Sequence, residues 1–348
     1  MPIEARRVYR LGLTIALALV AGYALALPLP FMPALFAIFL ASPPRPPLAP
    51  MQLLKLAVLV MFTTGTGLLL VPVLHAYPAT GLVLILIGLF VANNLSINKG
   101  QALIGAMLTV GLTLITAAGY ASYALALTVV QALVSGIVIA IVCHWLVYPW
   151  LPEAAQAAGP PKPDAEAKAS SRWLAARALI VVFPAYLMAL TNPQLYMPIV
   201  MKAVSLGQQD SIDNLRHAGR ELLGSTLLGG VFAMLFWVGL KVWPNLWMFF
   251  LWMLLFGLYF AAKLYGVLRS RFAGPFWINA AVTMLIMLGP AVADSANGKD
   301  VYMAFLVRMS LMIAVTVYAV VAIRLLDGWR TRYGARASSG TTQMAESV

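Results

Sequence analysis

Long apolar runs, separated by short breaks rich in Pro, Gly and polar residues, dominate the chain. A run of roughly 17 to 25 apolar residues matches the length of helix that crosses the hydrocarbon core of a membrane. Twelve such runs are present, and the second and the eighth are short. They lie near residues 9–27, 29–42, 53–74, 79–95, 101–119, 123–148, 174–191, 194–207, 217–240, 246–264, 273–292 and 301–326. The pattern therefore predicts an all-α integral membrane protein of about twelve transmembrane helices.

The composition supports this prediction and narrows the chemistry. Hydrophobic residues make up 62% of the chain and charged residues 10%, whereas about a quarter of the residues of a typical soluble domain are charged. The single cysteine, Cys143, lies within an apolar run, so no disulfide can form within the chain. The sequence shows no metal-ligand cluster, no nucleophile with its base and no cofactor fingerprint. We therefore expect a protein that is not an enzyme and that needs neither metal nor cofactor.

Lys and Arg are distributed unequally between the two ends of the predicted helices. If the N-terminus is cytoplasmic, the outer loops hold only Lys241 and Lys299, and the other basic residues, apart from Lys202 and Arg308 within spans, lie at inner ends and loops. This asymmetry follows the positive-inside rule and predicts that both termini are cytoplasmic. The net charge of +12 is then a matter of topology, so we do not expect a nucleic-acid partner. The N-terminus also resembles a secretory signal, but eleven further runs favour an uncleaved first span.

One polar stretch divides the chain into two halves of six runs each. Residues 152–171 are rich in Ala, Pro and charge, which is typical of a linker. We therefore expect a first six-helix repeat at 1–151, a cytoplasmic linker at 152–171, a second repeat at 172–329 and a cytoplasmic tail at 330–348.

Landmarks in the first half recur in the second at one period. Arg10 recurs as Arg177, Met32 as Met197, and Tyr77 as Trp243, at separations of 167, 165 and 166 residues. A constant period indicates an internal duplication. Because six is an even number of spans, both copies enter the membrane from the same side. The predicted pseudo-two-fold axis therefore runs along the membrane normal.

The short second run of each half contains several prolines: Pro28, Pro30 and Pro33 in the first half, and Pro193 and Pro198 in the second. Paired, Pro-interrupted segments at corresponding positions indicate a transport site, because a broken helix exposes backbone groups that must line a cavity or find partners. The alternative is that these segments are tight turns between adjacent spans. The first interpretation predicts that Pro33 and Pro198 border the substrate.

The ninth run begins with ionisable residues and continues with small ones, in the stretch RELLGSTLLGG that starts at Arg220. Glycine and small hydroxyl residues let membrane helices approach closely. The stretch is not a phosphate-binding loop, because no Gly-Lys-Ser/Thr follows and no strand precedes it. The sequence therefore gives no sign of ATP use.

This stretch resembles the Arg, Gly-Thr, Gly pattern of the fusaric-acid-resistance and aromatic-acid exporter superfamily, to which plant aluminium-activated malate transporters are related. Arg308 in the last run is similar to an Arg that begins the last span of each repeat in that superfamily. The first half has only a degenerate copy, Lys55 followed by residues 63–67, and no counterpart of Arg308. Larger relatives carry sizeable cytoplasmic domains, whereas here we expect only the linker and the tail after Trp329 to be cytoplasmic. It resembles a compact, membrane-only subgroup of about this length, whose members are mostly named as domains of unknown function.

Charged residues within spans are costly and are therefore candidates for function. We expect a substrate site for an organic anion in which Lys202, Arg220 and Arg308 supply positive charge. Further candidates for this site are Tyr196, Pro198, Phe31, Pro33 and Thr226. Trp277 is an additional aromatic candidate, although lipid contact is the common role of aromatic residues in spans. Candidates for proton coupling are Glu221, His217 and His144, with a structural hydrogen-bonding role as the alternative for each histidine.

The resemblance implies an inner-membrane exporter of organic, in particular aromatic carboxylic, acids, driven by the proton gradient or the membrane potential. Two alternatives remain open: a passive organic-anion channel, and a structural membrane protein without a substrate. The expected partners are a small organic anion and the lipid bilayer. The outer loops are short, so we also expect a periplasmic adaptor of the membrane-fusion type to continue the route. The sequence leaves the oligomeric state undetermined.

Overall fold

The computed structural model of the chain describes residues 2–44, 46–98, 101–153, 168–207, 215–298 and 300–345. Most of the predicted linker, residues 154–167, lies outside the described residues. Helices are the only regular secondary structure in the described ranges, as expected where no water can satisfy an open strand edge. They are α1 (Ile3–Ala24), α2 (Met32–Ala41), α3 (Pro50–Ala76), α4 (Pro78–Asn98), α5 (Ala102–Val110), the π-helix η1 (Gly111–Ile115), α6 (Thr116–Ala121), α7 (Tyr123–Val147), the 3-10 helix η2 (Tyr148–Trp150), α8 (Lys168–Thr191), α9 (Pro193–Gly207), α10 (Leu215–Val242), α11 (Leu246–Leu264), α12 (Gly274–Ala296) and α13 (Val301–Ala345).

Each of the twelve apolar runs coincides with helix, and ten of the resulting helical segments are long and apolar enough to cross a membrane. The protein is therefore a multi-pass α-helical membrane protein. The fifth run is one continuous helical segment with a π turn, η1, in its middle. The two short runs form α2, with 10 residues, and α9, with 15 residues. At about 1.5 Å per residue, α2 reaches only about half of the hydrocarbon thickness of about 30 Å.

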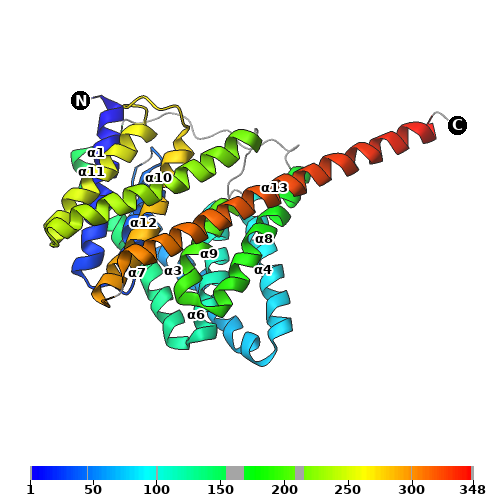
Figure 1. Ribbon diagram of the computed structural model, residues 1–348, viewed down its shortest axis with the longest axis horizontal. Helices are drawn as coiled ribbons and strands as arrows, with labels where there is room; N and C mark the ends of the chain where they lie inside the picture. Colours follow the sequence, from blue (N-terminus) through cyan, green and yellow to red (C-terminus); the bar gives the residue numbers. More distant parts are fainter. Residues whose placement is uncertain are drawn as a thin grey trace.

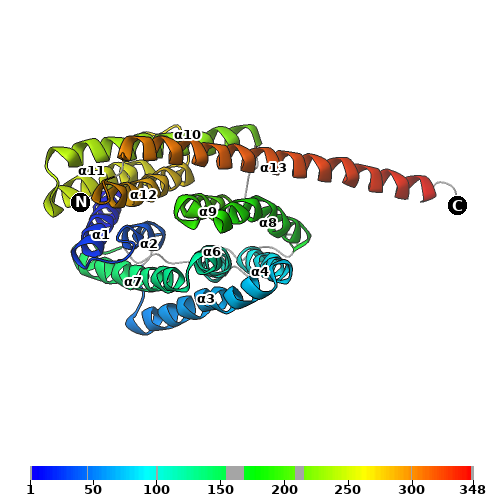
Figure 2. The ribbon, with the colours of Figure 1, turned by 60° about the horizontal axis from the view of Figure 1, so that its bottom comes forward.

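The helices form three layers (Figures 1 and 2). The central layer contains α1, α2, α9 and α8. One outer layer contains α3 to α7, and the other contains α10 to α13. Both short helices therefore lie in the middle of the protein, covered on both sides. Helix α13 continues to Ala345 and extends away from the bundle (Figure 1), so the predicted tail at 330–348 begins as a continuation of this helix.

The same helix contacts occur once in each half. Helix α1 packs against α2 and α7, and α8 packs in the same way against α9 and α13. Helix α3 packs against the α5–η1–α6 segment as α10 packs against α12. Between the halves, α1 contacts α11 and α4 contacts α8. Helices that occupy the same place in the order of the two halves thus have corresponding neighbours.

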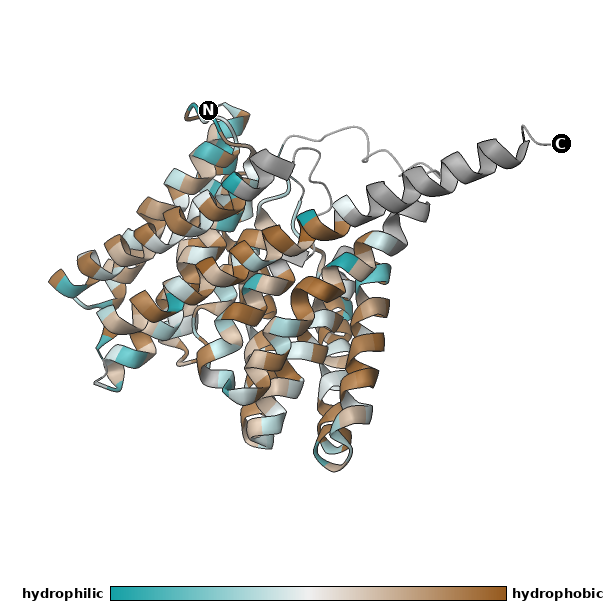
Figure 3. Cartoon of the chain, turned by 45° about the vertical axis from the view of Figure 1, so that its right-hand side comes forward, coloured by the Kyte–Doolittle hydropathy of each residue, from teal (hydrophilic) through white to brown (hydrophobic). Residues whose placement is uncertain are grey.

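Apolar residues predominate along the helices of the bundle (Figure 3), and many of their side chains are exposed. On α3, for example, Phe62 and Leu69 are about three-quarters exposed. In water such a surface would be unfavourable. In a bilayer it is the surface that contacts the lipid chains, because apolar side chains there cost nothing to expose.

Glycines allow the closest helix contacts. A Cβ atom on Gly67 of α3 would collide with the carbonyl oxygen of Gly111 in η1. A Cβ on Gly257 of α11 would lie 3.3 Å from the Cα of Gly12 in α1. By contrast, Gly65 of α3 has no atom within 4 Å of the position of an added Cβ. Small residues therefore set the distances between helices both within the first half and between the halves.

The contact at Gly67 leads to a stability prediction. Gly67→Ala will lower the unfolding temperature of the purified protein, because the methyl group forces α3 away from η1. Gly65→Ala is the matched control on the same helix and will leave the unfolding temperature unchanged or slightly raised, since alanine is the better helix former. Thermal unfolding in one detergent measures both. Equal effects of the two substitutions would contradict the packing of α3 on η1.

Candidate functional site

A cavity of about 310 Å³ lies in the middle of the protein, between the two short helices. It is lined by α2, α3, α5, η1 and α7 of the first half and by α9 and α12 of the second. Every lining residue is apolar, from Phe36 and Leu40 on α2 to Met201 on α9 and Ile286 on α12. The cavity can therefore accept an apolar group but offers no side-chain hydrogen bond to it.

A buried polar cluster lies beside this cavity and is centred on Lys202 of α9. The side chain of Lys202 has no exposed surface. Its Nζ donates hydrogen bonds to Asn279 Oδ1 at 2.6 Å and to Thr283 Oγ1 at 2.8 Å, both on α12. Asn279 Nδ2 in turn donates to Ser225 Oγ on α10 at 2.5 Å. Two helices of the second half, α12 and α10, thus place neutral polar groups around the lysine of a third, α9.

The small residues of α10 allow this cluster to form. A Cβ on Gly229 would lie 2.5 Å from the carbonyl oxygen of Ala280 and 2.7 Å from Cβ of Thr283. A Cβ on Gly230 would lie 2.5 Å from the sulfur of Met309 on α13. The stretch that starts at Arg220 therefore seats α12 and α13 closely against α10, so that Asn279 and Thr283 reach Lys202.

The polar cluster and the cavity share two helices. Asn279, Thr283 and Ile286 are spaced four and three residues apart, so they lie on one face of α12, and Ile286 lines the cavity. On α9, Met201 and Val204 line the cavity, whereas Lys202 lies on a different face of the helix and is fully buried. The cluster and the cavity are thus connected through α12, where Thr283 follows the lining residue Val282.

Sequence analysis did not single out Asn279 and Thr283. The available signal was an amide followed four residues later by a hydroxyl within the apolar run 273–292. On a helix this spacing places two hydrogen-bonding groups on one face, which in a membrane protein requires a partner. Lys202 is that partner.

The other two predicted cations lie elsewhere. Arg220 is exposed near the start of α10. Arg308 of α13 forms an ion pair with Asp294 of α12, with Nη2 and Oδ2 2.6 Å apart. Arg308 therefore has its counter-charge within the protein. None of the three cations lines the cavity, and Lys202 alone lies on a helix that does.

The remaining predicted substrate residues lie on α2 or just before it, on α9 and on α10, and they do not line the cavity. Tyr196 is half-buried, Phe31, Pro33, Pro198 and Thr226 are buried, and the hydroxyl of Thr226 donates to the carbonyl oxygen of Leu222 in its own helix. The ring of Phe31 lies against Gly289 of α12, which makes it a contact between the halves. Trp277 is buried and its Nε1 donates to Ser270 Oγ.

Two of the predicted proton-coupling residues, Glu221 and His144, lie in different halves of the chain. Glu221 is half-buried near the start of α10, and His144 is buried near the end of α7, where its ring lies edge-on to Tyr148. The side chain of His217 lies outside the described residues. Within the part of the chain that the structure describes, no group of three His, Cys, Asp or Glu residues is arranged to hold a metal ion.

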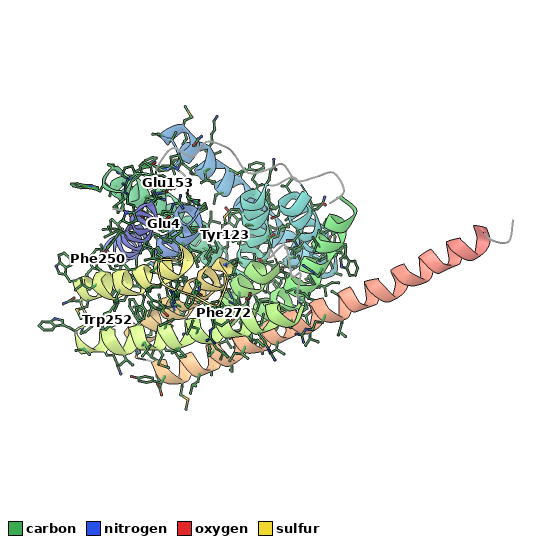
Figure 4. All side chains as sticks on the ribbon, turned by 90° about the horizontal axis from the view of Figure 1, so that it is seen from above. Glu4, Tyr123, Glu153, Phe250, Trp252 and Phe272 are labelled. Atoms are coloured by element: carbon green, nitrogen blue, oxygen red, sulfur yellow. The ribbon has the colours of Figure 1, made fainter. Side chains whose placement is uncertain are left out.

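A second charged cluster closes one end of the bundle. Glu153 accepts hydrogen bonds from Arg7 Nε at 2.7 Å and from Arg10 Nη2 at 2.6 Å; Figure 4 labels it close to Glu4 at the start of α1. Burial acts to raise the pKa of the Glu153 carboxyl, but the hydrogen bonds and charges of Arg7 and Arg10 outweigh it, so the pKa lies below its ordinary value. This cluster fixes the start of α1 to the segment that follows α7.

Comparison with known proteins gives one match. The pattern of a family described as "Protein of unknown function (DUF2955)" matches residues 7–147, which is less than half of the 348 residues and falls within the first half. No curated protein and no solved structure matches the chain. The chain is thus similar, over its first half, to a family named for a domain of unknown function, in agreement with that part of the resemblance noted in the sequence.

The lysine cluster leads to a prediction that uses a pair of substitutions. Asn279→Leu will destabilise the protein by about 1 to 3 kcal/mol, because it leaves a buried lysine without one of its acceptors. Adding Lys202→Met to Asn279→Leu will recover most of this loss, since removing both partners leaves no unsatisfied polar group. Denaturation in detergent measures each variant. A single variant as stable as the wild type, or a double variant less stable than the single, would show that the bond is absent.

The Glu153 cluster predicts a pH dependence of stability. A carboxyl whose pKa is lowered on folding contributes stability that is present above its ordinary pKa, 4.5, and is lost as the pH falls through the folded value. Glu153→Gln will therefore unfold at a lower temperature than the wild type at pH 7. The difference will shrink as the pH falls below 4.5. A difference that stays constant down to acid pH would contradict the assigned role of the carboxylate.

Proposed function

We propose that this protein is a secondary transporter that exports weak organic acids across the cell membrane. The observation that carries the proposal is Lys202, a fully buried lysine whose described partners are neutral and belong to α12, a helix that also lines the apolar cavity. A buried cation without a carboxylate is costly, and an anionic substrate would supply the missing charge.

The arrangement of the helices supports transport in particular. We infer that the two halves are parallel repeats related by a pseudo-two-fold axis along the membrane normal. If α1 corresponds to α8 and α4 to α11, then the contacts α1 with α11 and α8 with α4 are one contact made twice, as a two-fold axis requires. The cavity lies between α2 and α9, which correspond to each other. Substrate sites of transporters built from repeats are found at such an interface.

Orientation and driving force follow from the charges. With the start of α1 and the end of α7 in the cytoplasm, the arginine cluster around Glu153 lies at the inner end of the bundle, in keeping with the positive-inside rule. An inside-negative potential then favours the exit of an anion by about 2.3 kcal/mol per charge per 100 mV. Placement in the inner membrane and a periplasmic adaptor partner remain parts of this proposal.

Substitution of Lys202 tests the proposal. Lys202→Met will reduce efflux of a loaded organic acid at least tenfold relative to the amount of folded protein in the membrane, because the anion loses its counter-charge. Lys241→Met is the matched control: Lys241 is exposed at the far end of α10, where its Nζ lies 4.8 Å from the centre of the Tyr302 ring. Its efflux will equal that of the wild type.

Efflux is measured in cells and in proteoliposomes with a set membrane potential. Wild-type efflux by folded Lys202→Met would refute the assigned anion site. If the wild type exports none of the acids tested, the transport function itself is refuted. A wild-type current that reverses at the Nernst potential of the anion and does not respond to a pH gradient would assign the protein to the passive channels instead.

A further inference from the structure

The cavity and the lysine cluster together restrict the kind of acid that fits. The cavity is lined by apolar side chains alone. A hydroxyl, an amide or a second carboxylate placed in it would lose its hydrogen bonds to water and gain none from a side chain. One end of the ligand is therefore required to be hydrocarbon.

The volume of the cavity admits a hydrocarbon part of considerable size. One water needs roughly 10 to 15 Å³ of cavity volume of this kind, so the 310 Å³ cavity has room for a hydrocarbon body of about ten carbons. Several of the lining side chains, including Met32, Met107 and Met201, are methionines, which adapt to flexible apolar partners.

The charge of the site sets the other end of the ligand. An ammonium group has three donors, and Lys202 uses two of them for Asn279 and Thr283. One carboxylate can take the third donor and balance the single charge. At the repeat separation of 166 residues, the counterpart of Lys202 is Phe36, which lines the cavity. One half of the protein thus offers a cation and the other an apolar ring.

We propose that the ligand of this site is a monocarboxylate with an unsubstituted hydrocarbon body of about ten carbons, such as a medium-chain fatty acid. The inference rests on the proposed function for its setting, but it concerns binding and can be tested separately. The carboxylate contacts Lys202, and the hydrocarbon body fills the cavity toward Phe36. Hydroxylated aromatic acids and dicarboxylates are poor ligands, because a polar group would have to enter the apolar cavity.

The test is equilibrium binding of labelled acids to the purified protein in lipid nanodiscs, with binding to empty nanodiscs subtracted. From hexanoate to decanoate the affinity will rise roughly fourfold for each added methylene group. Decanedioate, which has the same chain length and a second carboxylate, will bind at least tenfold more weakly than decanoate.

Variants assign the two parts of the site. Lys202→Met will weaken decanoate binding at least tenfold. Leu133→Trp, which fills the cavity from α7, will have a similar effect, whereas Leu69→Trp, on the exposed face of α3, will bind as the wild type does. If a variant fails to fold, the chain-length series and the decanedioate comparison in the wild type still test the proposed ligand.

Two results would overturn the inference: an affinity that does not depend on chain length, or decanedioate binding as tight as that of decanoate. These failures are distinct from failure of the proposed function. Efflux of short or hydroxylated acids without any chain-length dependence of binding would leave transport standing and remove the inference. Binding that depends on chain length, without efflux of any acid, would support the inference about the ligand and remove the proposed transport function.

Discussion

In the hydrocarbon of a membrane, a helix can carry a charge into the protein interior only if other helices supply its polar partners. The structure depends on this constraint at Lys202. Asn279 and Thr283 on α12 supply the acceptors, and Ser225 on α10 completes the network. The glycines of α10 are needed because they let α12 come close enough. The close packing of the helices in the second half and the hydrogen bonds to Lys202 thus both follow from the need to satisfy a buried lysine.

The sequence predicted the secondary structure of this protein well, because hydrocarbon thickness imposes one length scale on every span. All twelve apolar runs are helical, and the two short runs became the two short helices α2 and α9. Periodicity did not show that these two helices would lie in the central layer. Their position depends on contacts between segments far apart in the chain, such as α1 with α11.

The site was predictable only in part. Lys202 was identified because a cation within an apolar run is conspicuous. Its acceptors were not, because an asparagine and a threonine in a span are individually common and become significant only when a third helix faces them. Arg308 looked equivalent to Lys202 in the sequence, but Asp294 on the adjacent helix neutralises it. Whether a buried charge is available to a ligand depends on such a partner, which one-dimensional information does not reveal.

The central claim is that one anion binds with its charge at Lys202 and its apolar body in the cavity between α2 and α9. The most direct measurement is an experimental structure of the protein with 10-bromodecanoate, in which the bromine marks the end of the chain. The account predicts bromine density within the cavity and a carboxylate oxygen about 3 Å from Lys202 Nζ. A carboxylate bound at Arg220 or Arg308, with the cavity empty, would contradict it.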